Sequence, residues 1–229
     1  MLRRSALGRL VALAGALFLA NVAIADALKL KVADKEPPAE LDESIRATLQ
    51  PKAVQLLDGD KAVFEFWFRK EVPLTTAPAS SVKGLDGLKA PILFGAVAVR
   101  ADRRDYKDNP IATGVHTMRF SLQPQNGDHL GTADFNYFLV LVPAKTDAKL
   151  DGIADYKALV TASSAGTSTE HPVIISLRPV DSATGDFPSL TEPAADHKAV
   201  RLKLTAKDAG APDKIDLVFD LVYEGKGHI

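Results

Sequence analysis

VQLLDGDKAVFEFWFR, residues Val54–Arg69, predicts two strands joined by a tight turn. The Asp-Gly pair at 58–59 separates two apolar runs, and it is a strong hairpin signal because such turns need positive φ. Successive side chains of a strand point to opposite faces. Three residues of the second run therefore share one face, which we assign to the core: Phe64, Phe66 and Phe68. We expect Trp67, on the other face, to provide a second packing surface rather than to stack on a ligand.

Other runs along the chain have the alternating or continuously apolar pattern of strands. They are Leu28–Val32, Ile92–Val99, Gly114–Leu122, Phe135–Val142, Val173–Leu177, Val200–Leu204 and Ile215–Tyr223. Lysines alternate with apolar residues in Leu28–Val32, which predicts an edge strand. Apolar residues at helical spacing predict two short helices, one carrying Leu41, Ile45 and Leu49 against the sheet, the other over Asp151–Ser163. Three segments predict irregular connections: Val72–Ala90, Ala101–Pro110 and Val180–Asp196.

Many short strands, turn-rich connections and two short helices favour a mainly β fold. We expect an antiparallel β-sandwich, in the style of immunoglobulin-like or transthyretin-like domains. A small closed β-barrel is the alternative, because the same strand pattern fits both architectures. The regular alternation of strands and helices that a parallel doubly wound sheet needs is missing.

The first 25 residues have the features of a signal peptide. Three arginines lie within the first nine residues, and Leu10–Ala20 is uncharged and apolar. Ala23-Ile24-Ala25 then offers the small residues that signal peptidase accepts, so we expect cleavage after Ala25, with Ala27 as a nearby alternative. A retained N-terminal anchor is the competing interpretation. We expect one domain over residues 26–229, in the periplasm or outside the cell.

Composition excludes several classes of function. The chain has no cysteine, which excludes a lipid-anchored lipoprotein, thiolate metal sites and cysteine nucleophiles. Without the three N-terminal arginines, 25 basic residues remain against 29 acidic ones, a charge of −4. No basic stripe alternates with aromatic residues, so we expect no nucleic-acid partner. No segment after the leader is apolar for long enough to span a bilayer.

Three motifs resemble signatures of a group of exported bacterial single-domain proteins. They are EFWFRKEVP at 65–73, LQPQNGDHLGT at 122–132 and GTSTEHP at 166–172. His116 departs from the pattern of that group, in which we expect tyrosine. The resemblance implies export and a single domain, and it carries no known activity to this chain.

The loop Ser121–Asp134 concentrates the residues best suited to a site. Asp128 and His129, together with the distant His171, have the carboxylate and imidazole groups that bind zinc, copper or iron(II). Asp134 and Asp105 complete such a set only if the fold brings them close. The competing interpretation is that Asp128 caps backbone amides in a glycine-containing turn, as aspartate often does.

Other candidate residues have weaker patterns. We expect His116 to be a hydrogen-bonded core histidine, and we assign no role to His197 or His228. Serines near 163–168 and His171 contain the residue types of a hydrolase triad, but no G-x-S-x-G turn accompanies them. No glycine-rich phosphate loop is present.

The sequence thus predicts an exported, non-catalytic protein with a binding or structural role in the cell envelope, whose partner is a small molecule or an envelope protein. A metal-dependent hydrolase using Asp128, His129 and His171 is the alternative, and a divalent metal would then be its cofactor.

Overall fold

The computed structural model describes residues 27–75, 85–105, 108–124, 127, 133–165, 171–180, 184–208 and 214–225. These residues form a mainly β fold. The strands are β1 (Lys29–Asp34), β2 (Lys52–Asp58), β3 (Lys61–Phe68), β4 (Val72–Leu74), β5 (Ile92–Val99), β6 (Arg103–Arg104), β7 (Pro110–Ile111), β8 (Gly114–Leu122), β9 (Tyr137–Pro143), β10 (Val173–Pro179), β11 (Ser189–Ala194), β12 (His197–Asp208) and β13 (Lys214–Glu224). The helices are α1 (Glu43–Arg46) and α2 (Tyr156–Ser164).

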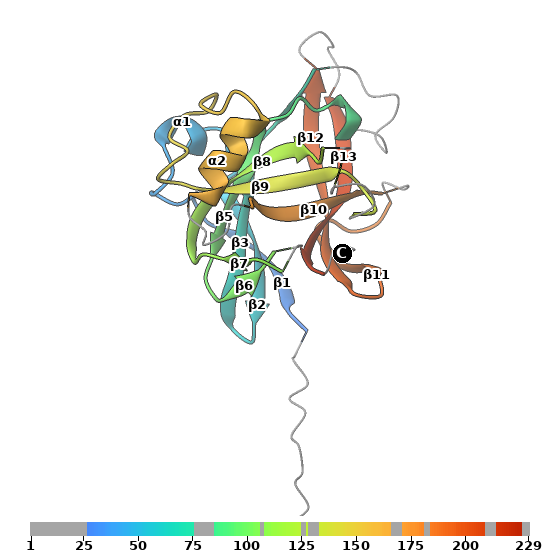
Figure 1. Cartoon of the computed structure of the whole chain (residues 1–229). Coiled ribbons are helices and arrows are strands. Elements are labelled where there is room, and N and C mark those ends of the chain that lie inside the picture. Colours follow the sequence, from blue (N-terminus) through green and yellow to red (C-terminus); the bar gives the residue numbers. More distant parts are fainter. Residues whose placement is uncertain are drawn as a thin grey trace, which may run out of the picture.

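One large mixed sheet organises the molecule (Figure 1). Its strands follow the order β1-β2-β3-β5-β8-β9-β10-β13-β12-β11, with antiparallel neighbours throughout. β4 adds a short parallel pairing to β12, and β6 and β7 form a separate two-stranded hairpin. Within the described ranges β1 and β11 are the two ends of this order and do not pair with each other. The described strands therefore form no closed barrel, and that alternative is not supported.

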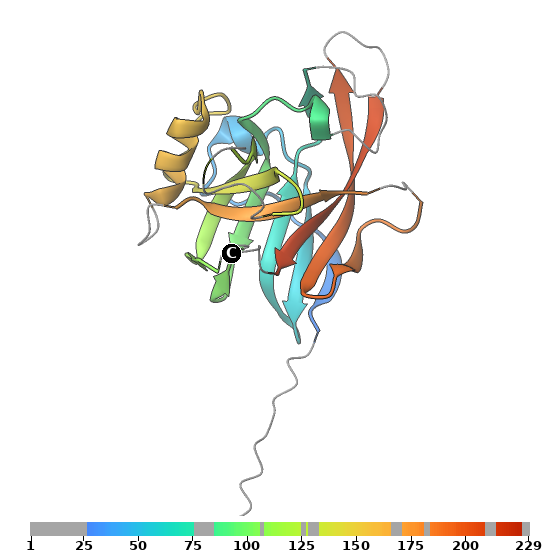
Figure 2. The same ribbon diagram turned by 45° about the vertical axis from the view of Figure 1, so that its right-hand side comes forward.

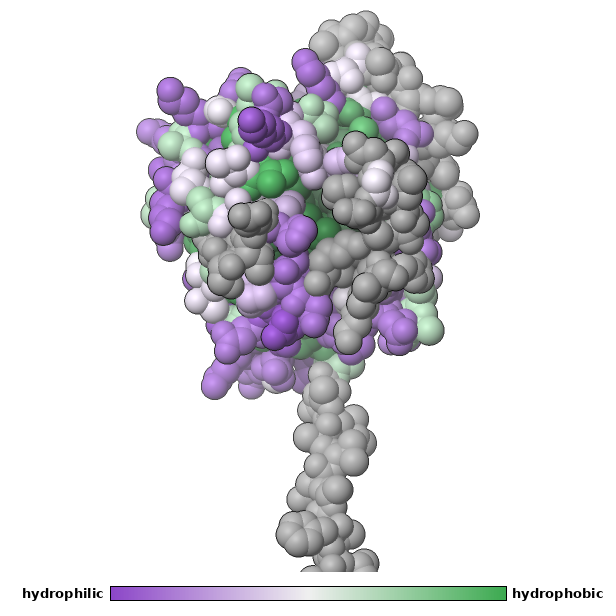
Figure 3. Space-filling view, viewed as in Figure 1, coloured by the Kyte–Doolittle hydropathy of each residue, from purple (hydrophilic) through white to green (hydrophobic). Residues whose placement is uncertain are grey.

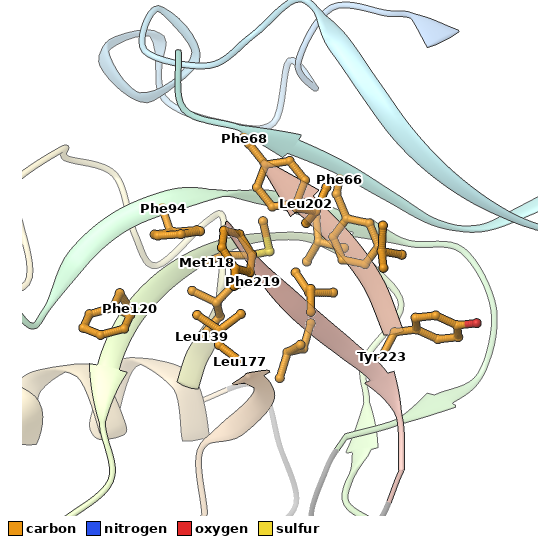
Figure 4. Close-up of a cluster of buried hydrophobic side chains, with 14 of the residues drawn as sticks. Phe66, Phe68, Phe94, Met118, Phe120, Leu139, Leu177, Leu202, Phe219 and Tyr223 are labelled. Atoms are coloured by element: carbon orange, nitrogen blue, oxygen red, sulfur yellow. The ribbon is translucent and has the colours of Figure 1, made fainter. Parts of the chain in front are cut away.

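The hairpin predicted from Val54–Arg69 is confirmed. Asp58 of β2 pairs with Lys61 of β3, and Gly59 between them has a φ of +59°, a conformation that glycine adopts without steric cost. The three phenylalanines of β3 lie in the main core, and Figure 4 shows two of them near Leu202 of β12. The first hairpin therefore contributes one wall of the core.

The sheet curls around this core. The rings of Phe94 on β5 and Phe219 on β13 meet edge to face with centroids 5.4 Å apart, although three strands separate β5 from β13 in the sheet. Contact between strands so distant in the order requires a strongly curved sheet, as twisted antiparallel sheets become when they bury one face. Met118, Leu139 and Leu177, from the strands between them, fill the same cluster (Figure 4).

A second, smaller core lies on the opposite face of β3. Trp67 is fully buried there, and its indole Nε1 donates a hydrogen bond of 2.9 Å to the Lys35 carbonyl oxygen. Leu41, Ile45 and Leu49 pack with it, as predicted, although only residues Glu43–Arg46 are helical. Large aromatic side chains contribute mainly through buried area, and the packing role predicted for Trp67 is confirmed.

Helix α2 covers the outer side of the sheet beside β9 (Figures 1 and 2). The Asp155 carboxylate caps its first turn by accepting from the Ala158 amide. Leu159 faces Val140 and Val142 in a further apolar cluster. Neither α1 nor α2, the helices of the described residues, has the length and apolarity of a membrane span.

Three segments predicted as irregular contain strands. β4 lies within 72–90, β6 lies within 101–110, where β7 also begins, and β11 lies within 180–196. The sequence of β11, SLTEPA, contains Pro193 and has no regular apolar alternation. It is a strand because its backbone pairs with β12, with a register shift between Thr191 and Ala194. Pairing of short edge strands depends on the neighbour more than on side-chain pattern.

Candidate functional site

A cleft of about 1030 Å³ opens at one end of the curled sheet. The β6–β7 hairpin forms one wall, and the start of β12 and the end of β13 form the other. In the view of Figure 3, hydrophilic residues gather where the β6–β7 hairpin lies. The cleft is therefore built largely by segments that are distant in the sequence, from residues 102–105, 108–111, 192–198 and 223–225.

The floor of the cleft is apolar and aromatic. Phe64 and Ile111 are buried beneath it, and Leu28 and Tyr223 also line it. Figure 4 shows the Tyr223 phenol oxygen pointing away from the core cluster. Burial raises the pKa of Tyr223 to about 12, with further increases from Glu224 and Glu192 and an opposing effect from Arg103. The phenol therefore remains protonated at neutral pH and keeps its ability to donate a hydrogen bond.

Arg103, which is positively charged, lies in the wall of the cleft. Its Nε is buried and has no hydrogen-bond partner among the described residues. Buried polar groups are nearly always hydrogen-bonded, and each exception calls for an explanation. A guanidinium has only donors, and the Nε atoms of Arg46 and Arg69, which do not line the cleft, are in the same state.

The carboxylates that line the cleft form two groups, those with a basic partner and those without one. Glu224 is paired with Lys198 at 2.6 Å, and Asp108 lies 3.7 Å from Arg104. The carboxylates of three other lining residues form no ion pair or hydrogen bond within the described ranges: Asp102, Glu192 and Asp196. All three residues are exposed. The groups left without a partner are thus three negative charges and one positive charge.

His197, to which the sequence assigned no role, is buried and lines this cleft. Its Nδ1 lies 3.4 Å from Nη1 of Arg178, which also donates to Asp134 at 3.0 Å. Arg178 belongs to β10, so these contacts join the end of the Ser121–Asp134 loop to the cleft. No sequence pattern indicated this position, because β12 begins three residues upstream of its predicted start.

The predicted metal site stays a prediction, because two of its three ligands fall outside the residues that the structure describes. Asp128 and His129 lie outside the described residues. His171 is described and exposed. Within the described ranges no group of three histidine, aspartate or glutamate side chains is arranged to hold a metal ion. The metal-dependent hydrolase therefore gains no support from these residues.

Asp105 and Asp134, considered as additional ligands, are engaged elsewhere. The Asp105 carboxylate accepts from the Asn109 amide at 2.8 Å and from the Ile174 amide at 3.1 Å, which ties the β6–β7 hairpin to β10. Asp134 binds Arg178, four residues further along β10. Strand residues at that separation are about 13 Å apart, so the two carboxylates do not converge on one ion.

His116 and Ser163 have structural contacts. His116 is 5% exposed, and its Nε2 lies 2.8 Å from the Ala112 carbonyl oxygen, as expected for a core histidine. Burial lowers its pKa, and the Ala112 bond opposes this effect. The buried Ser163 hydroxyl donates to the Leu141 carbonyl oxygen and accepts from the Val173 amide. Ser163 therefore joins α2 to β9 and β10 and is not placed as a nucleophile.

No protein-family model matches the chain, and neither a curated protein nor a solved structure matches it. The cleft therefore has to be interpreted from its own geometry and charge.

Proposed function

We propose that this chain is an exported, non-catalytic binding protein of sandwich type, with its ligand site in the cleft between β6–β7 and β12–β13. In this proposal the two halves of the curled sheet act as the two layers of the sandwich. The contact between Phe94 and Phe219 across the core supports that description. Binding proteins of this kind present ligands on loops and edges held by a rigid scaffold.

The observation that carries the proposal is the cleft itself, about 1030 Å³, which is lined by charged residues together with Phe64, Ile111 and Tyr223. Small-molecule sites combine apolar walls with a few polar groups that fix orientation. Arg103 and the protonated phenol of Tyr223 are such groups here. Ser163 of α2 and His116 of β8 each contact a backbone carbonyl oxygen, and neither lines the cleft.

Export rests on the sequence features of residues 1–25 and on the resemblance of the three motifs to exported proteins. The proposed location is the periplasm or the extracellular space. N-terminal sequencing of the protein recovered from each cell fraction tests this point. We expect a chain that begins at Asp26 in the exported fraction, and an uncleaved chain in the membrane fraction would contradict it.

A cleft-blocking variant tests the binding function. Ala195 is exposed and lines the cleft, so Ala195→Trp fills the space without disturbing the core. Lys145→Trp, in an exposed turn outside the cleft, is the matched control. Each protein is dialysed against the small molecules extracted from its own cells, and the retained compounds are identified by mass spectrometry.

We expect at least one compound to be enriched by the wild-type protein and by Lys145→Trp, but not by Ala195→Trp. The proposal fails if the wild-type protein enriches nothing, or if Ala195→Trp enriches the same compounds to the same extent.

A further inference from the structure

We infer that the open edge of β1 is a docking surface for a partner protein, which adds an extended strand of alternating acidic and apolar residues. β1 stands at one end of the strand order, and within the described ranges only β2 pairs with it (Figure 1). A segment bound at such an edge gains main-chain hydrogen bonds, and the side chains beside it set the specificity. This surface lies along β1 and does not depend on the ligand of the cleft.

The backbone of β1 is regular along its whole length. All six residues, Lys29–Asp34, pair with β2 without a register shift. β11, at the other end of the strand order, has a register shift between Thr191 and Ala194 and contains Pro193. Bulges and prolines prevent an edge from pairing with a further strand. β11 has both features and β1 has neither, so β1 is the edge suited to accept another strand.

The side chains of β1 that face the core are apolar and incompletely covered. Leu30 pairs with Leu56, and Val32 pairs with Val54; Leu56 belongs to the main core, and Val54 packs against it. Val32 is nevertheless 48% exposed, and Leu30 is only partly buried. An added strand would lie about 5 Å from β1. Apolar side chains on its core-facing side would remove Val32 from water, which is favourable.

The other face of β1 carries lysines that select acidic side chains. Lys29 and Lys31 are exposed, and their ammonium groups form no ion pair with described residues. Lys35, further along the same face, is by contrast paired with Glu65 at 2.6 Å. Opposite charges directly across two neighbouring strands stabilise their pairing, and like charges destabilise it. Acidic residues therefore fit the positions opposite Lys29 and Lys31.

The same lysines disfavour a second copy of this chain as the occupant. Antiparallel self-pairing centred on Lys31 sets this residue opposite itself. Pairing centred on Leu30 sets Lys29 opposite Lys31, and pairing centred on Val32 sets Lys29 opposite Lys35. Each of these registers places lysine against lysine, which is destabilising. Repulsion of the wrong partner contributes to specificity, and here it favours an acidic partner over another β1.

Calorimetric titration with three peptides tests the docking surface. The probes are EVEVEV, KVKVKV and EPEPEP, each acetylated at the N-terminus and amidated at the C-terminus, and each is titrated into the exported protein at low ionic strength. We expect EVEVEV to bind at least about tenfold more tightly than KVKVKV, because two opposite-charge pairs replace two like-charge pairs. EPEPEP keeps the negative charges but lacks the proline amide hydrogens, so it should not bind measurably.

Two double variants and hydrogen exchange assign the binding to β1. Lys29→Glu/Lys31→Glu should bind KVKVKV more tightly than EVEVEV. Lys145→Glu/Lys157→Glu makes the same change of net charge at exposed lysines outside β1, and it should keep the preference of the wild-type protein. Addition of EVEVEV to the wild-type protein should slow amide exchange within residues 29–34 and leave residues 189–194 unchanged.

Several outcomes would overturn the acidic strand partner. Absence of EVEVEV binding, or equal binding of KVKVKV or EPEPEP by the wild-type protein, would each do so. Loss of the preference in Lys145→Glu/Lys157→Glu would assign the effect to net charge rather than to β1. A wild-type dimer in sedimentation, with residues 29–34 already protected from exchange without peptide, would place a second copy on this edge instead.

Discussion

Two groups of charged residues in this protein differ in how many of their polar atoms have a hydrogen-bond or ion-pair partner. Arg119 and Asp147 lie inside the structure, with both side chains 1% exposed and Nε 2.7 Å from Oδ2. The Arg119 Nη2 also donates to Asp147 and to the carbonyl oxygens of Lys149 and Leu150. Thr117 donates to the same carboxylate. In the cleft, by contrast, Arg103 has a buried nitrogen without an acceptor.

The comparison distinguishes charged residues that stabilise the fold from charged residues that can bind a ligand. Asp147 lies in the connection between β9 and α2, and its bonds fix that connection to β8. A buried pair of this kind is destabilising to break, since one charge is then left without its partner. The exposed carboxylates of the cleft have no such partner to lose. Stability and ligand binding should therefore respond to different substitutions.

Replacing Asp147 should have the largest effect on stability. Asp147→Asn keeps the size of the side chain but leaves the Arg119 guanidinium buried without a counter-charge. We expect the free energy of unfolding to fall by about 3–5 kcal/mol, measured by urea denaturation.

The double variant Arg119→Met/Asp147→Leu removes both charges and is the control for this prediction. It should recover part of the lost stability, because neither side chain then needs a partner. A loss below about 1 kcal/mol for Asp147→Asn would mean that the pair does not hold the connection as the geometry indicates.

Glu65 provides an intermediate case between the two groups. Its carboxylate is 3% exposed and contacts Lys35 at 2.6 Å and Arg100 at 3.0 Å, whose side chains are 44% and 40% exposed. Burial alone would raise the pKa of Glu65, but hydrogen bonds from Lys35, Gln55 and Arg100 outweigh it and hold the pKa below its usual value. Glu65→Gln should therefore cost about 1–3 kcal/mol at pH 7.

The pH dependence of this cost follows from the sign of the shift. A lowered pKa means that the carboxylate contributes stability above its ordinary pKa of 4.5, and that this contribution is lost as the pH falls through the folded-state value. Denaturation of both proteins between pH 7 and pH 3 should show the difference shrinking toward acid. A difference that is constant over this range would contradict the assignment.

The carboxylates of the cleft should have the smallest effect on stability. Glu192→Gln and Asp196→Asn remove exposed charges that form no ion pair in the described residues. We expect the free energy of unfolding to change by no more than about 0.5 kcal/mol in either direction. A loss as large as that of Glu65→Gln would place these carboxylates among the structural charges and remove the contrast with Arg119 and Asp147.

Long apolar runs were sufficient to predict the central elements. β5 and β8 have the bounds expected from their sequences, and the face of β3 that carries its phenylalanines was assigned correctly from their period. These segments bury most of their side chains, so the apolar pattern of their sequence reflects the buried environment. β11 and the β6–β7 hairpin are short and polar, and their strand character depends on pairing with other backbone segments.

The cleft was not predicted, for a related reason. Its residues come from β6–β7, β12 and β13, and the sequence around 101–110 has only the composition of a charged turn. Some carboxylates of the cleft have a basic partner on a neighbouring strand, as Glu224 of β13 has Lys198 of β12. No spacing along the chain encodes which carboxylate faces which cation. The loop with Asp128 and His129 was favoured instead because its residue types are suited to metals.

The sequence alone determined the hairpin at 54–69, the mainly β class and the faces that enter the core, because strand period and hydrophobic burial act over a few neighbouring residues. Only the tertiary structure decided the order of the strands, the curl that brings Phe94 to Phe219, and the cleft at its end. These features depend on contacts between residues that are distant in the chain, such as Phe94 with Phe219, and local pattern does not specify such contacts.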